Sequence, residues 1–145
     1  MIYVDTNVIV YAIENHPRYG ASCKKILEDV QEGRLEAACS VLVLVELMNV
    51  LKKVNDILSR ERKPTLNLKD NIEAVMSLPL RWLDLDFLVI ERASTYSYDV
   101  SGIDYVHVSS MELDSITEVI SADREFDRVK ILARVDPTDY RTPKR

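Results

Sequence analysis

The strongest constraint on the fold is the alternation of short, mostly apolar runs with longer segments of helical periodicity. The apolar runs lie at residues 2–4, 35–39, 81–85, 118–121 and 131–135. Strands that are buried on both faces of a parallel sheet read as such runs, because neither face meets water. Strands that alternate with helices also favour a parallel sheet, since the helices supply the crossovers. We therefore predict an α/β fold with helices on both faces of a parallel sheet.

Helices are predicted between the strands, where apolar residues recur every three or four positions. These segments are residues 8–13, 18–31, 40–62, 67–77, 87–98 and 101–113. Thr6 or Asn7 is expected to cap the first helix and Ser40 the third. Ser101 is expected to cap the last, with Asp104 three residues further on as a variant of the capping box.

Length and composition are those of one globular domain. With 145 residues, 47% of them hydrophobic, the chain can bury a sizeable core as a single domain over residues 1–145. A net charge of −5 argues against a passive nucleic-acid coat, which would be basic. The sequence shows no signal peptide and no apolar stretch long enough for a bilayer, and its two cysteines lack a metal-binding spacing. A cytoplasmic protein without a membrane segment is therefore expected.

Four acidic residues stand out by their positions. Asp5 and Asp123 directly follow the first and fourth apolar runs, and parallel sheets bind ligands at the carboxyl ends of their strands. Glu46 interrupts an apolar run, and Asp104 lies in the first turn of the last predicted helix. Each position also has a structural explanation. An acid can cap a helix, face water at its edge, or favour the positive end of its dipole.

Together, the four carboxylates point to a metal site if the fold brings them into one cleft. Two unit charges about 4 Å apart repel by roughly 4 kcal/mol at an effective dielectric near 20, so such a cleft requires a cation or protonated acids. Oxygen ligands without histidine or cysteine favour Mg²⁺ or Mn²⁺. Such ions activate water and stabilise the oxygens of a phosphodiester during its hydrolysis. The acids therefore indicate nuclease chemistry.

Four segments resemble the motifs of a PIN domain. They are DTNVIVYA at 5–12, SVLVLVEL at 40–47, SGIDYVHVSSMEL at 101–113 and VISADREFD at 119–127. The resemblance spans nearly the whole chain, whose length is similar to that of the toxins of VapBC-type toxin–antitoxin pairs. It implies a three-layer α/β/α sandwich with a central parallel sheet of strand order 3-2-1-4-5. It also implies Mg²⁺- or Mn²⁺-dependent ribonuclease activity.

The resemblance also assigns roles to individual residues. Asp5 and Asp104 would be the principal metal ligands, and Glu46 and Asp123 would complete the acidic site directly or through water. Supporting roles would fall to Thr6, Asn7, Ser40 and Asp127. The first three of these would orient the carboxylates by hydrogen bonding, and Asp127 would be a structural or supporting acid. His107 departs from the usual Ala-rich third motif. A packed or surface histidine is the favoured interpretation, although its position three residues after Asp104 allows it to approach the cleft.

Partners follow from the same resemblance. The toxins act on RNA, are inhibited by a small cognate antitoxin and are often homodimers. A sequence clue to an interface is the extra apolar set Leu42, Val45 and Met48 on the third predicted helix, which can equally be additional core. A solitary RNA-processing nuclease and a non-catalytic PIN-like scaffold that binds RNA or protein remain alternatives.

Two further classes fit the acids less well. A phospho-acceptor receiver domain would need an acid pair early in the chain and a lysine after the fifth strand, where this chain has Asp136 and Pro137. A phosphatase with an Asp-x-Asp nucleophile would need an aspartate at position 7, where this chain has Asn7.

Overall fold

A five-stranded parallel sheet forms the centre of the protein. The computed structural model describes residues 1–144. The strands are β1 (Ile2–Val4), β2 (Ala37–Ser40), β3 (Arg81–Leu83), β4 (Glu118–Ile120) and β5 (Ala133–Val135). They pair in the order β3-β2-β1-β4-β5, all parallel, which confirms the predicted sheet and its strand order. β1 is the middle strand, with Tyr3 opposite Ala38 of β2 and Val119 of β4.

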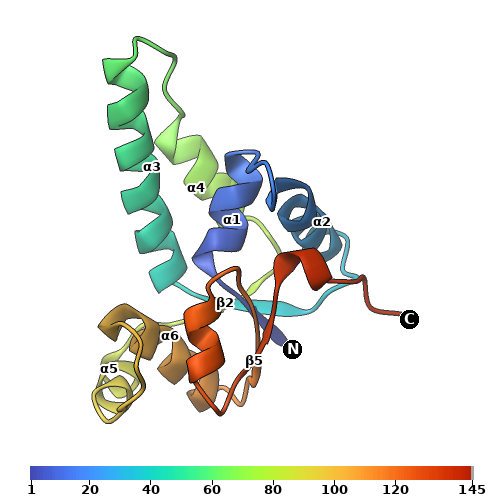
Figure 1. The fold of residues 1–145 in the computed structure, drawn as a ribbon, viewed down its shortest axis with the longest axis vertical. Helices are drawn as coiled ribbons and strands as arrows, with labels where there is room; N and C mark the ends of the chain where they lie inside the picture. The colour runs from blue at the N-terminus through green and yellow to red at the C-terminus, as the bar shows by residue number, and fades with distance from the viewer. Residues whose placement is uncertain (145) are drawn as a thin grey trace.

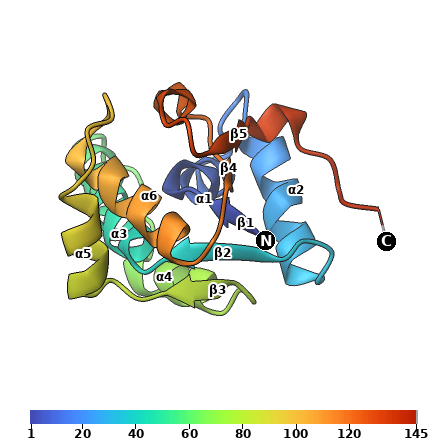
Figure 2. The ribbon, with the colours of Figure 1, turned by 90° about the horizontal axis from the view of Figure 1, so that it is seen from below.

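Helices cover both faces of this sheet. They are α1 (Thr6–Ile13), α2 (Gly20–Gln31), α3 (Leu42–Arg60), α4 (Leu68–Met76), α5 (Phe87–Ala93) and α6 (Gly102–Leu113), with short 3₁₀ helices η1 (Arg124–Arg128) and η2 (Pro137–Asp139). In Figure 1, α1 to α4 lie above the strands, and α5 and α6 lie below them. Figure 2, seen from below, shows the strands side by side in the order β5-β4-β1-β2-β3. Among residues 1–144, no helix combines the length and apolarity needed to cross a membrane.

The core is built by the short strands and the helix faces that pack on them. Tyr3 and Val4 of β1 and Val119 and Ile120 of β4 have no exposed surface. Their continuous burial is the physical reason for the uninterrupted apolar runs in the sequence, because helices cover the strands on both faces. The central position of β1 places the residue that follows it, Asp5, at the middle of the sheet edge.

The helix predicted over 87–98 is too long. α5 ends at Ala93, and Ser94 and Thr95 turn their hydroxyls onto the carbonyl oxygens of Glu91 and Arg92, at 2.6 and 2.7 Å. Such local bonds compete with helix continuation. Three tyrosines then pack against one another before and within α6, namely Tyr96, Tyr98 and Tyr105.

Two other element starts also differ from prediction. α2 begins at Gly20 rather than at residue 18, because the Nδ1 atom of His16 accepts the backbone N–H groups of Arg18 and Tyr19. β2 begins at Ala37 rather than at residue 35, since the N–H of Leu35 bonds to a carbonyl oxygen at the end of α2. Both differences come from local hydrogen bonds that hydrophobic periodicity does not report.

Candidate acidic site

The acidic site lies at the carboxyl ends of the two central strands. The backbone N–H of Asp5 bonds to the carbonyl oxygen of Ile120 at 3.1 Å, which joins the end of β1 to the end of β4. Asp123 follows three residues later on the β4 side. Asp5 and Asp123 therefore lie at the same edge of the sheet, where adjacent parallel strands end and where parallel sheets bind ligands.

The four predicted acids line one cleft of about 300 Å³. Its lining is Asp5, Thr6, Asn7, Val10, Tyr11, Glu46, Val50, Asp104 and Asp123. This lining includes no lysine or arginine. Within residues 1–144, Asp5, Asp104 and Asp123 also form no ion pair shorter than 4.0 Å. The cleft therefore gathers negative charge, and His107, which contacts Glu46, is the one ion-pair partner of its four acids among the described residues.

Asp5 is held by three donors. Its Oδ1 atom accepts the N–H of Thr6 at 2.8 Å, and its Oδ2 atom accepts Asn7 Nδ2 at 3.0 Å and Ser121 Oγ at 2.7 Å. Asp5 is thus the N-cap of α1, and the expectation that Thr6 or Asn7 caps this helix is wrong. Burial raises the pKa of Asp5, although the charge of His107 and the hydrogen bonds of Ser121 and Thr6 moderate that rise.

Glu46 reaches the cleft from α3. Its Oε1 atom accepts the Thr6 hydroxyl at 2.9 Å and also contacts Nε2 of His107. Burial alone would raise the pKa of Glu46, but the hydrogen bonds from His107 and Thr6 and the charge of His107 outweigh burial and lower it. Glu46 therefore contributes an ionised carboxylate to the cleft.

Asp104 enters from the first turn of α6. Ser101 caps this helix as predicted, since its hydroxyl accepts the N–H of Asp104 at 3.1 Å. The Asp104 side chain lines the cleft. Burial raises the pKa of Asp104, the Ser101 hydroxyl opposes that rise, and the nearby charges of Asp123 and Asp5 add to it. One oxygen each from Asp104, Asp123 and Glu125 lies within 4.8 Å of the other two.

Two predicted supporting residues lie outside the cleft lining. The hydroxyl of Ser40 accepts the N–H of Leu42 at 3.1 Å rather than orienting a carboxylate, and the N-cap of α3 is Val41, so the predicted cap at Ser40 is wrong. Asp127 accepts two bonds from the Arg134 guanidinium, at 2.9 and 3.3 Å. Arg134 in turn donates to the carbonyl oxygen of Ser121 at 2.9 Å. Asp127 therefore holds Arg134, which bonds to Ser121 directly after β4, and does not itself line the cleft.

Sequence reasoning missed Ser121 and Glu125. Ser121 links the site, because its Oγ atom donates to Asp5 and accepts Asn7 Nδ2 and the N–H of Asp123. A fully buried serine directly after an apolar strand is a detectable signal for such a role. Glu125 carries no comparable signal, because it is one of several acids in a charged segment.

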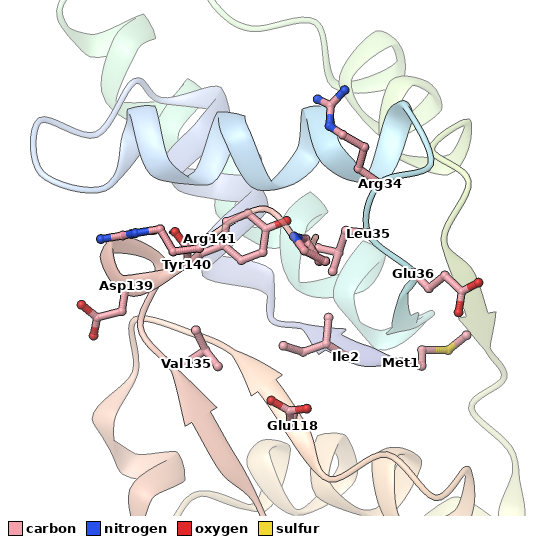
Figure 3. Close-up of a pocket in the computed structure, with 11 residues that line it drawn as sticks. Met1, Ile2, Arg34, Leu35, Glu36, Glu118, Val135, Asp139, Tyr140 and Arg141 are labelled. Carbon is pink, nitrogen blue, oxygen red and sulfur yellow. Dashed lines mark hydrogen bonds between the residues drawn. The ribbon is translucent and has the colours of Figure 1, made fainter. Parts of the chain in front are cut away.

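A larger cavity, of about 450 Å³, lies at the opposite end of the strands. Figure 3 shows Ile2 and Glu118, the first residues of β1 and β4, beside Tyr140 and Arg141. Parallel sheets bind ligands at the other, carboxyl edge. The smaller acidic cleft is therefore the stronger candidate for chemistry.

Solved structures with the same architecture include bacterial toxin–antitoxin proteins. VapBC2 from Rickettsia felis, bound to a DNA fragment of its promoter, is 21% identical with a TM-score of 0.66, and the match covers 93% of this chain and 98% of that one. A toxin–antitoxin complex from Klebsiella pneumoniae is 17% identical with a TM-score of 0.64, covering 94% and 98%. Mycobacterium tuberculosis VapC20, a Sarcin-Ricin loop cleaving toxin, is 16% identical with a TM-score of 0.66, covering 89% and 95%.

The sequence itself matches a family model. No curated protein is significantly similar to this chain in sequence. The model of the PIN domain, however, matches residues 2–132, which include all four acids of the cleft. The chain therefore belongs to the PIN-domain family.

Proposed function

We propose that this protein is a metal-dependent endoribonuclease and the toxin of a toxin–antitoxin pair. The observation that carries the proposal is the convergence of Asp5, Glu46, Asp104 and Asp123 on one cleft whose lining contains no basic residue. Membership of the PIN-domain family and the likeness to a Sarcin-Ricin loop cleaving toxin support a nuclease rather than a scaffold. A non-catalytic scaffold would have no need to keep these mutually repelling charges together.

The donor set fits Mg²⁺ or Mn²⁺. It offers only carboxylate oxygens, and these hard ligands suit such ions better than Zn²⁺ or Cu²⁺. Asp5, Asp104, Glu46 and Asp123 would hold the ion, and Glu125, which has an oxygen within 4.8 Å of Asp104 and Asp123 oxygens, lies beside them. A bound ion would supply Lewis acidity that activates water and stabilises charge on the phosphodiester. The chain's own contribution is orientation, since Thr6, Asn7 and Ser121 fix the Asp5 carboxylate.

Cleavage of RNA by the purified protein tests this function. We expect single-stranded RNA to be cut in the presence of Mn²⁺ or Mg²⁺, to survive in excess EDTA, and to be cut again when the metal is restored. Gel electrophoresis of end-labelled RNA measures the products. A single-stranded DNA of the same sequence is the control for substrate class. RNA that stays intact with either ion, or is cut equally in EDTA, would contradict the proposal.

Metal should also stabilise the folded protein. An ion that binds only the folded state at 100 times its Kd adds about 2.7 kcal/mol to the unfolding free energy. For a chain of this length, that gain corresponds to a rise of roughly 5–10 °C in Tm. Differential scanning fluorimetry with MnCl₂ measures this shift, with the same ionic strength of NaCl as the control. An unchanged Tm at saturating Mn²⁺ would argue against a shared carboxylate site.

The proposed partners are a cognate antitoxin and a second copy of the chain. The structural relatives from Klebsiella pneumoniae and Rickettsia felis are toxin–antitoxin proteins, which supports the antitoxin. Of the apolar set on α3, Leu42 is buried in the core, whereas Val45 and Met48 are exposed and available to a partner. Light scattering tests the homodimer. A short adjacent reading frame that encodes a DNA-binding protein would support the pair, and a lone gene would favour a solitary RNA-processing nuclease.

A further inference from the structure

One buried polar side chain behind the cleft, His107, has a second polar partner besides Glu46. His107 is 1% exposed and lies on α6, one turn after Asp104. The packed histidine expected from the sequence is present, but both of its ring nitrogens have polar partners. Nδ1 lies 2.6 Å from the hydroxyl of Tyr3, and Nε2 contacts Oε1 of Glu46.

The ionised Glu46 carboxylate determines that Nε2 of His107 carries a proton. A carboxylate only accepts, so Nε2–H is the donor to Oε1 whether the ring is neutral or charged. Nδ1 shares a hydrogen bond with the Tyr3 hydroxyl, whose oxygen also accepts the N–H of Ser40 at 3.1 Å. Both ring nitrogens are therefore held by polar partners, as buried polar groups require.

The network fixes one side of the Glu46 carboxylate. His107 and Thr6 both meet Oε1, one from α6 and the other from α1. No described residue bonds to Oε2, so this oxygen is left for a ligand in the cleft. Glu46 otherwise has a long side chain on a helix surface, with several rotamers available to it. The hydrogen bonds from Thr6 on α1 and His107 on α6 select one of these Glu46 rotamers.

We propose that His107, held by Tyr3, is a positioning residue that keeps Glu46 oriented for the metal and the substrate in the acidic cleft. The inference rests on the proposed function for the role of Glu46. Ligands that are held by hydrogen bonds to outer residues bind metal more tightly than unsupported ones. Because the readout below is metal affinity, the test does not depend on knowing the RNA substrate.

Mn²⁺ binding by calorimetry, together with the Tm of each metal-free protein, tests this role. We expect H107L to weaken Mn²⁺ binding about 10- to 100-fold, the range typical for loss of a supporting partner. H107Q keeps an N–H at the position of Nε2 and should restore affinity to within a few fold of the wild type. Y3F removes only the hydroxyl that orients the ring. Y3F should also weaken Mn²⁺ binding. If H107L does not fold, Y3F provides the test instead.

Ser109 provides a matched control on the same helix. It is fully buried, and its hydroxyl donates to the carbonyl oxygen of Val89 at 2.7 Å, outside the cleft. S109A should lower Tm while leaving the Kd for Mn²⁺ unchanged. The double variant H107L/E46Q should bind Mn²⁺ no more weakly than E46Q alone, because both changes remove the same interaction.

The outcomes separate this inference from the proposed function. Wild-type protein that binds no Mn²⁺ would overturn both. Wild-type protein that binds Mn²⁺ with the same Kd as Y3F and H107L would overturn only the positioning role. A loss of affinity in S109A as large as that in H107L would also overturn it, since general destabilisation would then explain the effect.

Discussion

Changing Asp104 to asparagine should reduce metal-dependent RNA cleavage by about 100-fold or more, at the upper end of the losses typical for metal-site residues. The substitution is nearly isosteric. The cap from Ser101 uses the backbone N–H of residue 104, which asparagine keeps. The variant therefore keeps the fold and removes one charge from the cleft. Initial rates of RNA cleavage at saturating Mn²⁺ measure the loss.

The stability of the same variant should change in the opposite direction. Because burial and the charges of Asp123 and Asp5 raise the pKa of Asp104, its ionised form is disfavoured in the folded protein at neutral pH. Without metal, D104N should consequently have a higher Tm than the wild type, and it should lose most of the rise caused by Mn²⁺.

D99N is the matched control. Its carboxylate lies in the segment before α6 and is 96% exposed, so neither cleavage nor metal-free Tm should change by much. D5N should also lose cleavage, but it is a less clean test because its new amide faces donors from Asn7 and Ser121. Cleavage that persists unchanged in D104N or D5N would contradict the proposed mechanism.

The parts of this fold that are predictable from the sequence are those set by burial. The strands and their parallel arrangement follow from runs such as residues 2–4 and 119–120, which are apolar on both faces. The strand order came from the family resemblance rather than from the residues themselves. The end of α5 was not predictable from apolar spacing, because hydroxyl groups on Ser94 and Thr95 terminate the helix.

The candidate site likewise contains residues that are predictable from the sequence and residues that are not. Asp5 and Asp123 are identifiable because acids at strand ends are brought together by the sheet. The roles of Ser121 and His107 depend instead on which atoms meet across more than sixty positions of sequence, as in the contact between His107 and Glu46. Residue type and local spacing can mark such a position, as for Ser121 directly after β4, but they do not identify the atoms that it contacts. Glu125 was missed for the same reason, since its oxygen meets Asp104 only in the folded chain.

Replacing Asp29 with alanine should destabilise the protein by about 1–3 kcal/mol, the cost of leaving hydrogen-bond donors around a buried acceptor unpaired. The Asp29 side chain has no exposed surface and lies near the end of α2. It accepts bonds from Lys25 and Arg34 and from the hydroxyls of Tyr140 and Thr142, all between 2.6 and 2.9 Å. Figure 3 shows Arg34 and Tyr140 beside α2, so one carboxylate fastens the C-terminal segment to this helix.

Urea unfolding followed by circular dichroism measures this loss. The control is E73A, which breaks the exposed pair of Glu73 with Lys69 at 3.7 Å and should cost no more than about 0.5 kcal/mol. A midpoint for D29A close to that of E73A would show that the buried carboxylate contributes little to stability.

The contribution of Asp29 should disappear in acid. Burial would raise the pKa of Asp29, but hydrogen bonds from Lys25, Thr142, Tyr140 and Arg34 outweigh it and hold the pKa well below its ordinary value. A pKa that is lower in the folded than in the unfolded state adds stability above the unfolded pKa, near 3.9, and loses it as pH falls toward the folded pKa. The difference in unfolding free energy between the wild type and D29N should therefore stay constant from pH 8 to about 5 and shrink below about pH 4. A difference that persists unchanged at pH 3 and below would mean that packing, rather than the charge of Asp29, holds the C-terminal segment on α2.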